Sequence, residues 1–265
     1  MWERNGGFCP GGVDNQKSGG DASLRRHASG SCGNGARCFA AFGQQTILAV
    51  TALLFIFSLL TGCGGTPRSG VLFYGDSIFG KWDLQAFFPG QDVINGGHFG
   101  KRSDELLAAL PDALSGKNVC SGFDGAPGIA ATLNCRPIPP PATIVIFAGW
   151  NNMFQGYTVD ARPDVIKMVG LARKAGLRVL ICTVYRFDPA HPARWMVPTG
   201  NAPVSFYDQW RNPLNDMIRS IQGPGIAVVD LSRLFENESG YTVDGVHPNA
   251  TGYAQMHDAI APLLN

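Results

Sequence analysis

The sequence predicts an α/β protein, a three-layer αβα sandwich built on one five-stranded parallel sheet. Five short apolar segments rich in β-branched residues recur between residues 70 and 230, and each is bounded by Gly, Pro or Asn. Amphipathic helical patterns separate these segments. The chain has 265 residues, 45% of them hydrophobic, which is enough for one sizeable core. Because no internal repeat is visible, we assign residues 70–265 to a single domain.

The strands are expected at residues 70–74, 93–95, 143–148, 179–184 and 226–230. Helical patterns follow at residues 163–175, with Gly176 just past the end, and at 206–221. A last one at 250–264 has Asn249 as a candidate N-cap. Right-handed crossovers between parallel strands place helices on both faces of the sheet. The expected strand order is therefore flavodoxin-like.

Two long stretches interrupt this alternation, at residues 116–141 and 186–204. Long insertions in compact domains are often binding loops, so we assign the second to the wall of a substrate pocket. The aromatic residues expected to contact substrate are Trp150, Tyr185, Phe187 and Trp195.

The first long stretch contains Cys120 and Cys135. Outside the cytoplasm such a pair is expected to form a disulfide, which leaves Cys182 as a small buried hydrophobe in a strand. The sequence has no CxxC pair and no cluster of His and Cys, so we expect neither a metal site nor a cofactor.

Charge excludes one class of partner. The net charge is +1 and the isoelectric point is near 7.6. No cluster of Lys and Arg with interleaved aromatic residues is present, so we expect no nucleic-acid partner. We also expect the protein to be a monomer.

Residues 1–62 differ from the rest of the chain. Residues 1–45 are rich in Gly, Ser and Asn and show no apolar periodicity, so we expect them to be disordered. Residues 46–60 are nearly all apolar and follow several arginines, a pattern that resembles a secretory signal peptide. An uncleaved membrane anchor is the alternative, although these 15 residues fall short of the roughly 20 that a span requires.

The apolar run ends in Leu60-Thr61-Gly62-Cys63, which resembles a bacterial lipobox. The resemblance implies cleavage before Cys63 and diacylation of that cysteine. Residues 1–62 would then be a leader and lipoprotein signal peptide, and residues 63–69 a linker. We therefore expect a lipid-anchored protein of the cell envelope, on the periplasmic or extracellular side of a bacterial membrane.

The most informative stretch runs from Val71 to Ser77 and reads VLFYGDS. Ligands collect beyond the carboxyl ends of parallel strands, so Ser77 follows the first strand at the position of a nucleophile. The alternative is that Ser77 only caps the next helix.

A serine nucleophile needs a base, which is usually a histidine oriented by a carboxylate. The segment DGVHPN places Asp244 three residues before His247, between the last strand and the last helix. A rival pair, Asp188 and His191, lies within the second irregular stretch. We favour His247 as the base and Asp244 as the residue that orients it.

Acyl transfer also requires donors for the developing oxyanion. The second strand ends in Asn95-Gly96-Gly97, and the third is followed by Gly149-Trp150-Asn151-Asn152. Each signal alone is weak, because Gly and Asn after a strand usually mark only a turn.

Together these four stretches, in this order, resemble the SGNH (GDSL-type) hydrolase superfamily, and the resemblance covers nearly all of residues 70–264. It implies that Ser77 is the nucleophile and that His247 and Asp244 complete a triad. The oxyanion donors implied are the backbone of Ser77, Gly97 as the best glycine with Gly96 as the alternative, and the side chain of Asn151. Asn152 stands where the family usually has Asp, which puts support of this loop in question. The elbow G-x-S-x-G of α/β-hydrolases is absent around Ser77.

The expected function is that of a serine esterase that cleaves ester-linked acyl groups of a lipid or an acylated saccharide through an acyl-enzyme. An envelope acyltransferase that moves an O-acetyl group to a saccharide could use the same site. A non-catalytic envelope binding module is an alternative of another class, against which the intact Ser77, Asp244 and His247 argue.

Overall fold

A computed structural model describes residues 68–122, 132–154, 160–190 and 204–264, all of which belong to the unit Gly64–Asn265. The main sheet has five parallel strands in the order β2-β1-β5-β6-β7. In chain order these strands are β1 (Val71–Gly75), β2 (Val93–Gly97), β5 (Thr143–Phe147), β6 (Arg178–Cys182) and β7 (Ile226–Val229). This is the predicted flavodoxin-like order, with β1 between β2 and β5.

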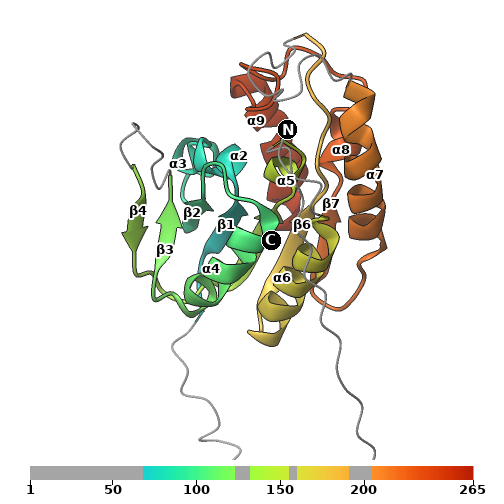
Figure 1. The fold of residues 1–265 in the computed structure, drawn as a ribbon. Coiled ribbons are helices and arrows are strands. Elements are labelled where there is room, and N and C mark those ends of the chain that lie inside the picture. The colour runs from blue at the N-terminus through green and yellow to red at the C-terminus, as the bar shows by residue number, and fades with distance from the viewer. Residues whose placement is uncertain (1–67, 123–131, 155–159, 191–203, 265) are drawn as a thin grey trace, which may run out of the picture. The chain divides into compact units, whose positions relative to one another are not determined.

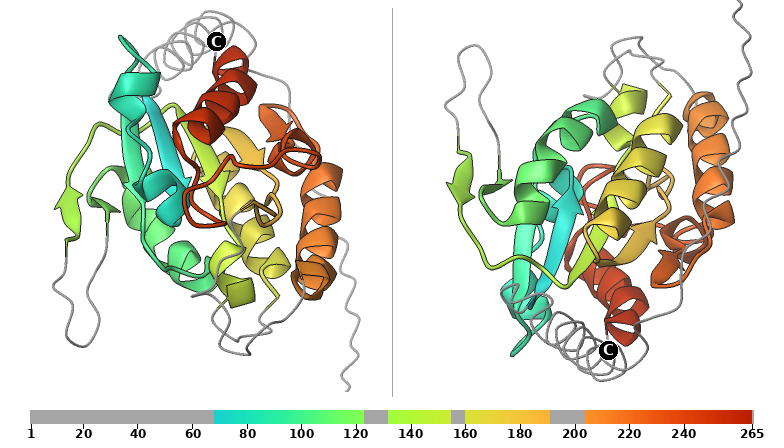
Figure 2. Two further views of the ribbon diagram at one scale, coloured as in Figure 1. Left: turned by 90° about the horizontal axis from the view of Figure 1, so that it is seen from above. Right: turned by 90° about the horizontal axis from the view of Figure 1, so that it is seen from below.

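Helices cover both faces of the sheet (Figures 1 and 2). The longer helices are α4 (Ser103–Ser115), α6 (Arg162–Lys174), α7 (Val204–Ser220) and α9 (Ala250–Ile260), and the shorter ones are α2 (Ser77–Gly80), α3 (Leu84–Phe87), α5 (Trp150–Phe154), α8 (Leu231–Leu234) and the 3-10 turn η1 (Ala261–Leu263). Figure 2 shows α4 and α6 on one face and α9 on the other. The architecture is therefore the predicted αβα sandwich.

The centre of the sheet is closed to water. All five residues of β5 are buried, as a parallel strand covered on both faces requires. Gly75, at the end of β1, lies against the backbone of Phe147 so closely that a Cβ would collide with the Phe147 carbonyl oxygen. Only glycine therefore fits immediately before the sequence Asp76-Ser77.

The predicted strands agree with the structure to within one or two residues, and Asn249 caps α9 by accepting a hydrogen bond from the Gly252 N–H. The stretch 116–141 was expected to be irregular, but it contains an antiparallel pair, β3 (Val119–Ser121) and β4 (Asn134–Arg136). β3 lies beside β2, and β4 lies on the far side of β3 (Figure 1). Each strand has only three residues, and the side chains of β4 are all exposed, so hydrophobic alternation in the sequence is too short to reveal the pair.

The predicted disulfide joins β3 and β4, between Cys120 and Cys135. Cys182 is a buried free cysteine, as expected. Among the helices of the described residues, none is both long enough and apolar enough to cross a membrane.

Candidate active site

Ser77 is the first residue of α2 and follows β1 at the carboxyl edge of the sheet. The cap of this helix is the preceding residue, Asp76, whose Oδ1 accepts a hydrogen bond from the Ile78 N–H at 2.9 Å. The alternative role of Ser77 as the N-cap is therefore not what the structure shows. Its hydroxyl is available for another partner.

That partner is His247. Ser77 Oγ lies 2.9 Å from His247 Nε2, across 170 residues of chain. His247 Nδ1 lies 2.7 Å from Asp244 Oδ2, and Asp244 Oδ1 accepts the backbone N–H of His247 at 2.8 Å. The structure thus brings the three residues predicted from two distant motifs into one hydrogen-bonded chain.

Burial and neighbouring charges set the protonation states of His247 and Asp244. Burial lowers the pKa of His247 below its ordinary value of 6.5, the charge of Lys81 acts in the same direction, and Asp244 opposes both. Burial alone would raise the pKa of Asp244, but hydrogen bonds from the backbone and ring of His247 bring it below 3.8. At neutral pH the arrangement is therefore a hydroxyl, a neutral imidazole and a carboxylate.

A second carboxyl group lies directly beside the serine. Asp76 is 1% exposed, and its Oδ2 has no hydrogen-bond partner among the described residues. Burial raises the pKa of Asp76 to about 7, against the opposing effect of the Ile78 N–H. Asp76 is a site residue that was not predicted from the sequence, although an Asp before a helix start is a recognisable N-cap signal.

The structure does not support Gly97 as an oxyanion donor. Its N–H already donates to Asn95 Oδ1 at 2.9 Å, and Asn95 Nδ2 donates to the carbonyls of Phe79 and Trp82 at 2.8 and 3.2 Å. A Cβ on Gly97 would collide with the backbone of Gly80. Gly97 therefore permits β2 to pack against α2, and this close approach, which is not visible in the sequence, accounts for the glycine.

Asn151 lies in α5, just after the carboxyl end of β5. Its Nδ2 donates to the carbonyl oxygen of Lys101, in the segment after β2, at 2.9 Å. Because β1 lies between β2 and β5, this bond connects the segments on either side of the strand that leads to Ser77. An amide nitrogen carries two hydrogens, so one remains for a second acceptor.

The neighbouring Asn152 supports this loop even though it departs from the family's usual Asp. Its side chain is buried, its Oδ1 accepts the Ser103 N–H at 2.9 Å, and its Nδ2 donates to Ser103 Oγ at 2.9 Å. Ser103 Oγ in turn donates to Asp164 at 2.8 Å. An amide can serve both a donor and an acceptor, so Asn suits this position.

The predicted substrate contacts need correction. Trp150, Tyr185 and Phe187 are all buried in the hydrophobic core, where Trp150 packs edge-on against both of the others. Tyr185 instead holds the segment next to His247 in place, because its hydroxyl donates a hydrogen bond to the Val246 carbonyl oxygen at 2.6 Å. Large aromatic side chains contribute strongly to the packing of protein cores, which is the role of these three residues. Trp195 lies outside the described residues, as does His191 of the rival pair.

The described part of the chain contains no group of three His, Cys, Asp or Glu side chains that could hold a metal ion. The site formed by Ser77, His247 and Asp244 has the groups needed for nucleophilic catalysis. It combines a hydroxyl, a base in hydrogen-bond contact with it, and a carboxylate that orients the base.

Comparisons with known proteins identify a matching family and similar folds. The model of the GDSL-like Lipase/Acylhydrolase family matches residues 73–255, and no curated protein matches the chain significantly. A GDSL-like lipase from Bacteroides thetaiotaomicron has a TM-score of 0.55 at 18% identity, covering 84% of this chain and 97% of its own. A Bacteroides fragilis protein assigned as an acylhydrolase has a TM-score of 0.53 at 22% identity, with coverages of 75% and 90%. An acetyl xylan esterase has a TM-score of 0.50 at 16% identity, with coverages of 74% and 99%.

Proposed function

Because the chain belongs to the GDSL-like lipase/acylhydrolase family and is an ester-cleaving hydrolase, we propose that Ser77, His247 and Asp244 are its catalytic triad. The observation that carries this proposal is the hydrogen-bonded chain from Ser77 Oγ through the His247 ring to Asp244, with distances of 2.9 and 2.7 Å. The substrate class is an ester with an acyl group on a lipid or a saccharide.

The first step is acyl transfer to the enzyme. Ser77 Oγ attacks the ester carbonyl carbon while His247 Nε2 takes its proton, and the imidazolium formed is stabilised by Asp244. His247 then gives that proton to the leaving alcohol, and the acyl group remains bonded to Ser77. In the second step His247 takes a proton from water, whose oxygen attacks the acyl carbon. The bond from that carbon to Ser77 Oγ then breaks, His247 returns the proton to Oγ, and the carboxylic acid is released. The lowered pKa of His247 keeps it in the unprotonated form that both steps require at neutral pH.

The developing negative charge on the carbonyl oxygen needs donors. We assign this role to the backbone N–H of Ser77 and to the second N–H of Asn151 Nδ2. The bond from Asn151 to Lys101 fixes the amide, so little reorganisation accompanies the reaction. Gly97 is left out of this assignment because its N–H is held by Asn95.

Kinetics of single and double variants test the triad. We expect Ser77→Ala and His247→Ala each to abolish nearly all hydrolysis of p-nitrophenyl acetate, and the double variant to lose little more, because the residues act as a unit. Asp244→Ala should be milder, since an imperfectly oriented His247 is still a base. Full esterase activity in Ser77→Ala would overturn the mechanism, and so would multiplicative losses in the double variant.

We also propose that the enzyme works in the cell envelope, anchored by a lipid on Cys63. The lipobox-like LTGC and the preceding apolar run support this location, although they lie outside the described residues. The disulfide between Cys120 and Cys135 supports it independently, because such bonds persist in oxidising compartments.

A further inference from the structure

The loop that carries the base and its carboxylate rests on the segment that follows β6. The Tyr185 hydroxyl donates to the Val246 carbonyl at 2.6 Å, and the Tyr241 hydroxyl donates to the Arg186 carbonyl at 2.7 Å. These two bonds run in opposite directions between the segments. Residues 240–247 are therefore not a free loop but are fastened to the carboxyl end of the sheet.

Several of the hydrogen bonds between these two segments are made by the carboxylate of Asp188, a residue that is fully buried. Its Oδ1 accepts the backbone N–H groups of Ala190 and Gly240, both at 2.9 Å. Its Oδ2 accepts the backbone N–H of Thr242 at 3.0 Å and the Thr242 hydroxyl at 2.9 Å. The N–H of Asp188 donates to the Gly245 carbonyl at 3.1 Å.

These bonds continue toward the triad through Thr242. While its hydroxyl donates to Asp188, its Oγ1 accepts the Gly245 N–H at 3.0 Å, so the turn that contains Asp244 is closed around it. We propose that Asp188 is a positioning residue that holds Asp244 and His247 in the geometry of ester cleavage by clamping this turn through Thr242. The inference rests on the proposed function of the triad.

The charge of Asp188 strengthens the clamp. Burial alone would raise the pKa of this carboxyl, but the N–H groups of Gly240, Ala190 and Thr242 bring it down to about 2. Hydrogen bonds to an ionised acceptor are roughly twice as strong as those between neutral groups. An amide at this position would present an NH₂ group to at least one of the N–H donors.

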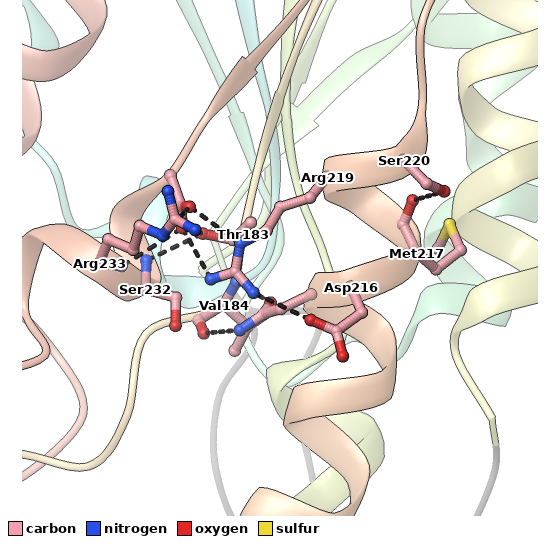
Figure 3. Close-up of polar contacts among 10 residues, drawn as sticks. Thr183, Val184, Asp216, Met217, Arg219, Ser220, Ser232 and Arg233 are labelled. Atoms are coloured by element: carbon pink, nitrogen blue, oxygen red, sulfur yellow. Dashed lines mark hydrogen bonds and ion pairs between the residues drawn. The ribbon is translucent and has the colours of Figure 1, made fainter.

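A second carboxylate offers a matched control, after the neighbouring strand β7. Asp230 Oδ1 accepts the Thr183 hydroxyl at 2.9 Å, and Arg219 Nε donates to Asp230 Oδ2 at 2.9 Å. Figure 3 labels Thr183 and Arg219 of this cluster, together with Asp216, to which Arg219 of α7 also donates. As at Asp188, a carboxylate accepts a threonine hydroxyl in this cluster. The cluster around Asp230, however, connects α7 with the end of β7 rather than with residues 240–247.

The test uses the full-length chain and measures kcat and KM for p-nitrophenyl acetate, well below the melting temperature of each variant. We expect Asp188→Asn and Thr242→Val each to lower kcat by about tenfold or more while KM changes little, because small displacements of catalytic groups are costly. Thr242→Ser keeps the hydroxyl and should restore kcat to near the wild-type value. Asp230→Asn should lower the melting temperature and leave kcat within about twofold.

Coupling to Asp244 separates positioning from general stability. If Asp188 acts through the orientation of Asp244, then adding Asp188→Asn to Asp244→Asn should lower kcat little further. A multiplicative loss would overturn the proposal, and so would an unchanged kcat in Thr242→Val. If Asp188→Asn does not fold, the comparison of Thr242→Val with Thr242→Ser decides alone. Activity that survives Ser77→Ala would instead overturn the proposed function, so the two failures are distinguishable.

Discussion

The buried carboxyl of Asp76 makes a quantitative prediction about pH and stability. Its pKa in the folded protein is about 7, against an ordinary value of 3.8 in the unfolded chain, because it is buried and its Oδ2 has no partner among the described residues. Between these values the folded state binds a proton that the unfolded state has lost, so the free energy of unfolding must fall as the pH rises. The free energy of unfolding falls by at most about 1.4 kcal/mol per pH unit. The fall is complete once the pH is above the pKa that Asp76 has in the folded protein.

The substitution Asp76→Asn removes this proton while the amide oxygen can still accept the Ile78 N–H. Urea unfolding of both proteins at about pH 5 and about pH 8.5 gives their stability difference, in which the titration of groups shared by both cancels. From the two pKa values, we expect this difference to move in favour of the variant by about 3 kcal/mol over that interval. A difference that stays constant to within about 0.5 kcal/mol would show that Asp76 does not bind a proton on folding. A shift in favour of the wild type would show that folding lowers the pKa of Asp76 instead of raising it.

Three further predictions concern separate parts of the chain. Replacing both Cys120 and Cys135 by Ala opens a cross-link with a sequence separation of 15, and should lower the free energy of unfolding by about 3 kcal/mol in urea titrations; unchanged stability would contradict a structural role. Asn151→Ala should lower kcat by about 10²-fold while a serine-reactive phosphonate still labels Ser77 slowly, and an unchanged kcat would remove Asn151 from the oxyanion site. Cys63→Ala should leave an unprocessed or mislocalised precursor, whereas mass spectrometry that finds the leader intact on the native protein would exclude the lipoprotein assignment.

Much of the fold could be predicted because its signals are local. Buried parallel strands are continuous apolar runs, and the run that ends before Ser77 was placed to within one residue. The triad could be predicted for a related reason. The carboxyl ends of the strands meet at one edge, so Ser77 after β1 and His247 before α9 are brought together by topology.

The errors arise where one pattern has two structural causes. A glycine after a strand can bind an oxyanion or allow close packing, and for Gly97 only the structure reveals the bond to Asn95 and the contact with Gly80. An aromatic residue after a strand can face a ligand or the core, and Trp150 and Tyr185 face the core. Local sequence does not contain the distant partner that decides between these outcomes.

Asp188 illustrates the same limit. In the sequence it belongs to a rival Asp-x-x-His pair, but in the structure its carboxylate binds the turn that precedes His247. The partners, Gly240 and Thr242, are more than 50 residues away along the chain. Its part in the site could be recognised only once these segments were seen together.

The catalytic role of Ser77 is tested most directly by mapping a covalent adduct. The purified protein is treated with a p-nitrophenyl phosphonate, and the modified peptide is identified by mass spectrometry in the wild type and in His247→Ala. We expect one phosphonate on Ser77 in the wild type, formed with loss of esterase activity, and little or none in the variant, because without the base the hydroxyl is a weak nucleophile. Complete inactivation with the label on another residue, or equal labelling of Ser77 in both proteins, would contradict catalysis by Ser77 and His247.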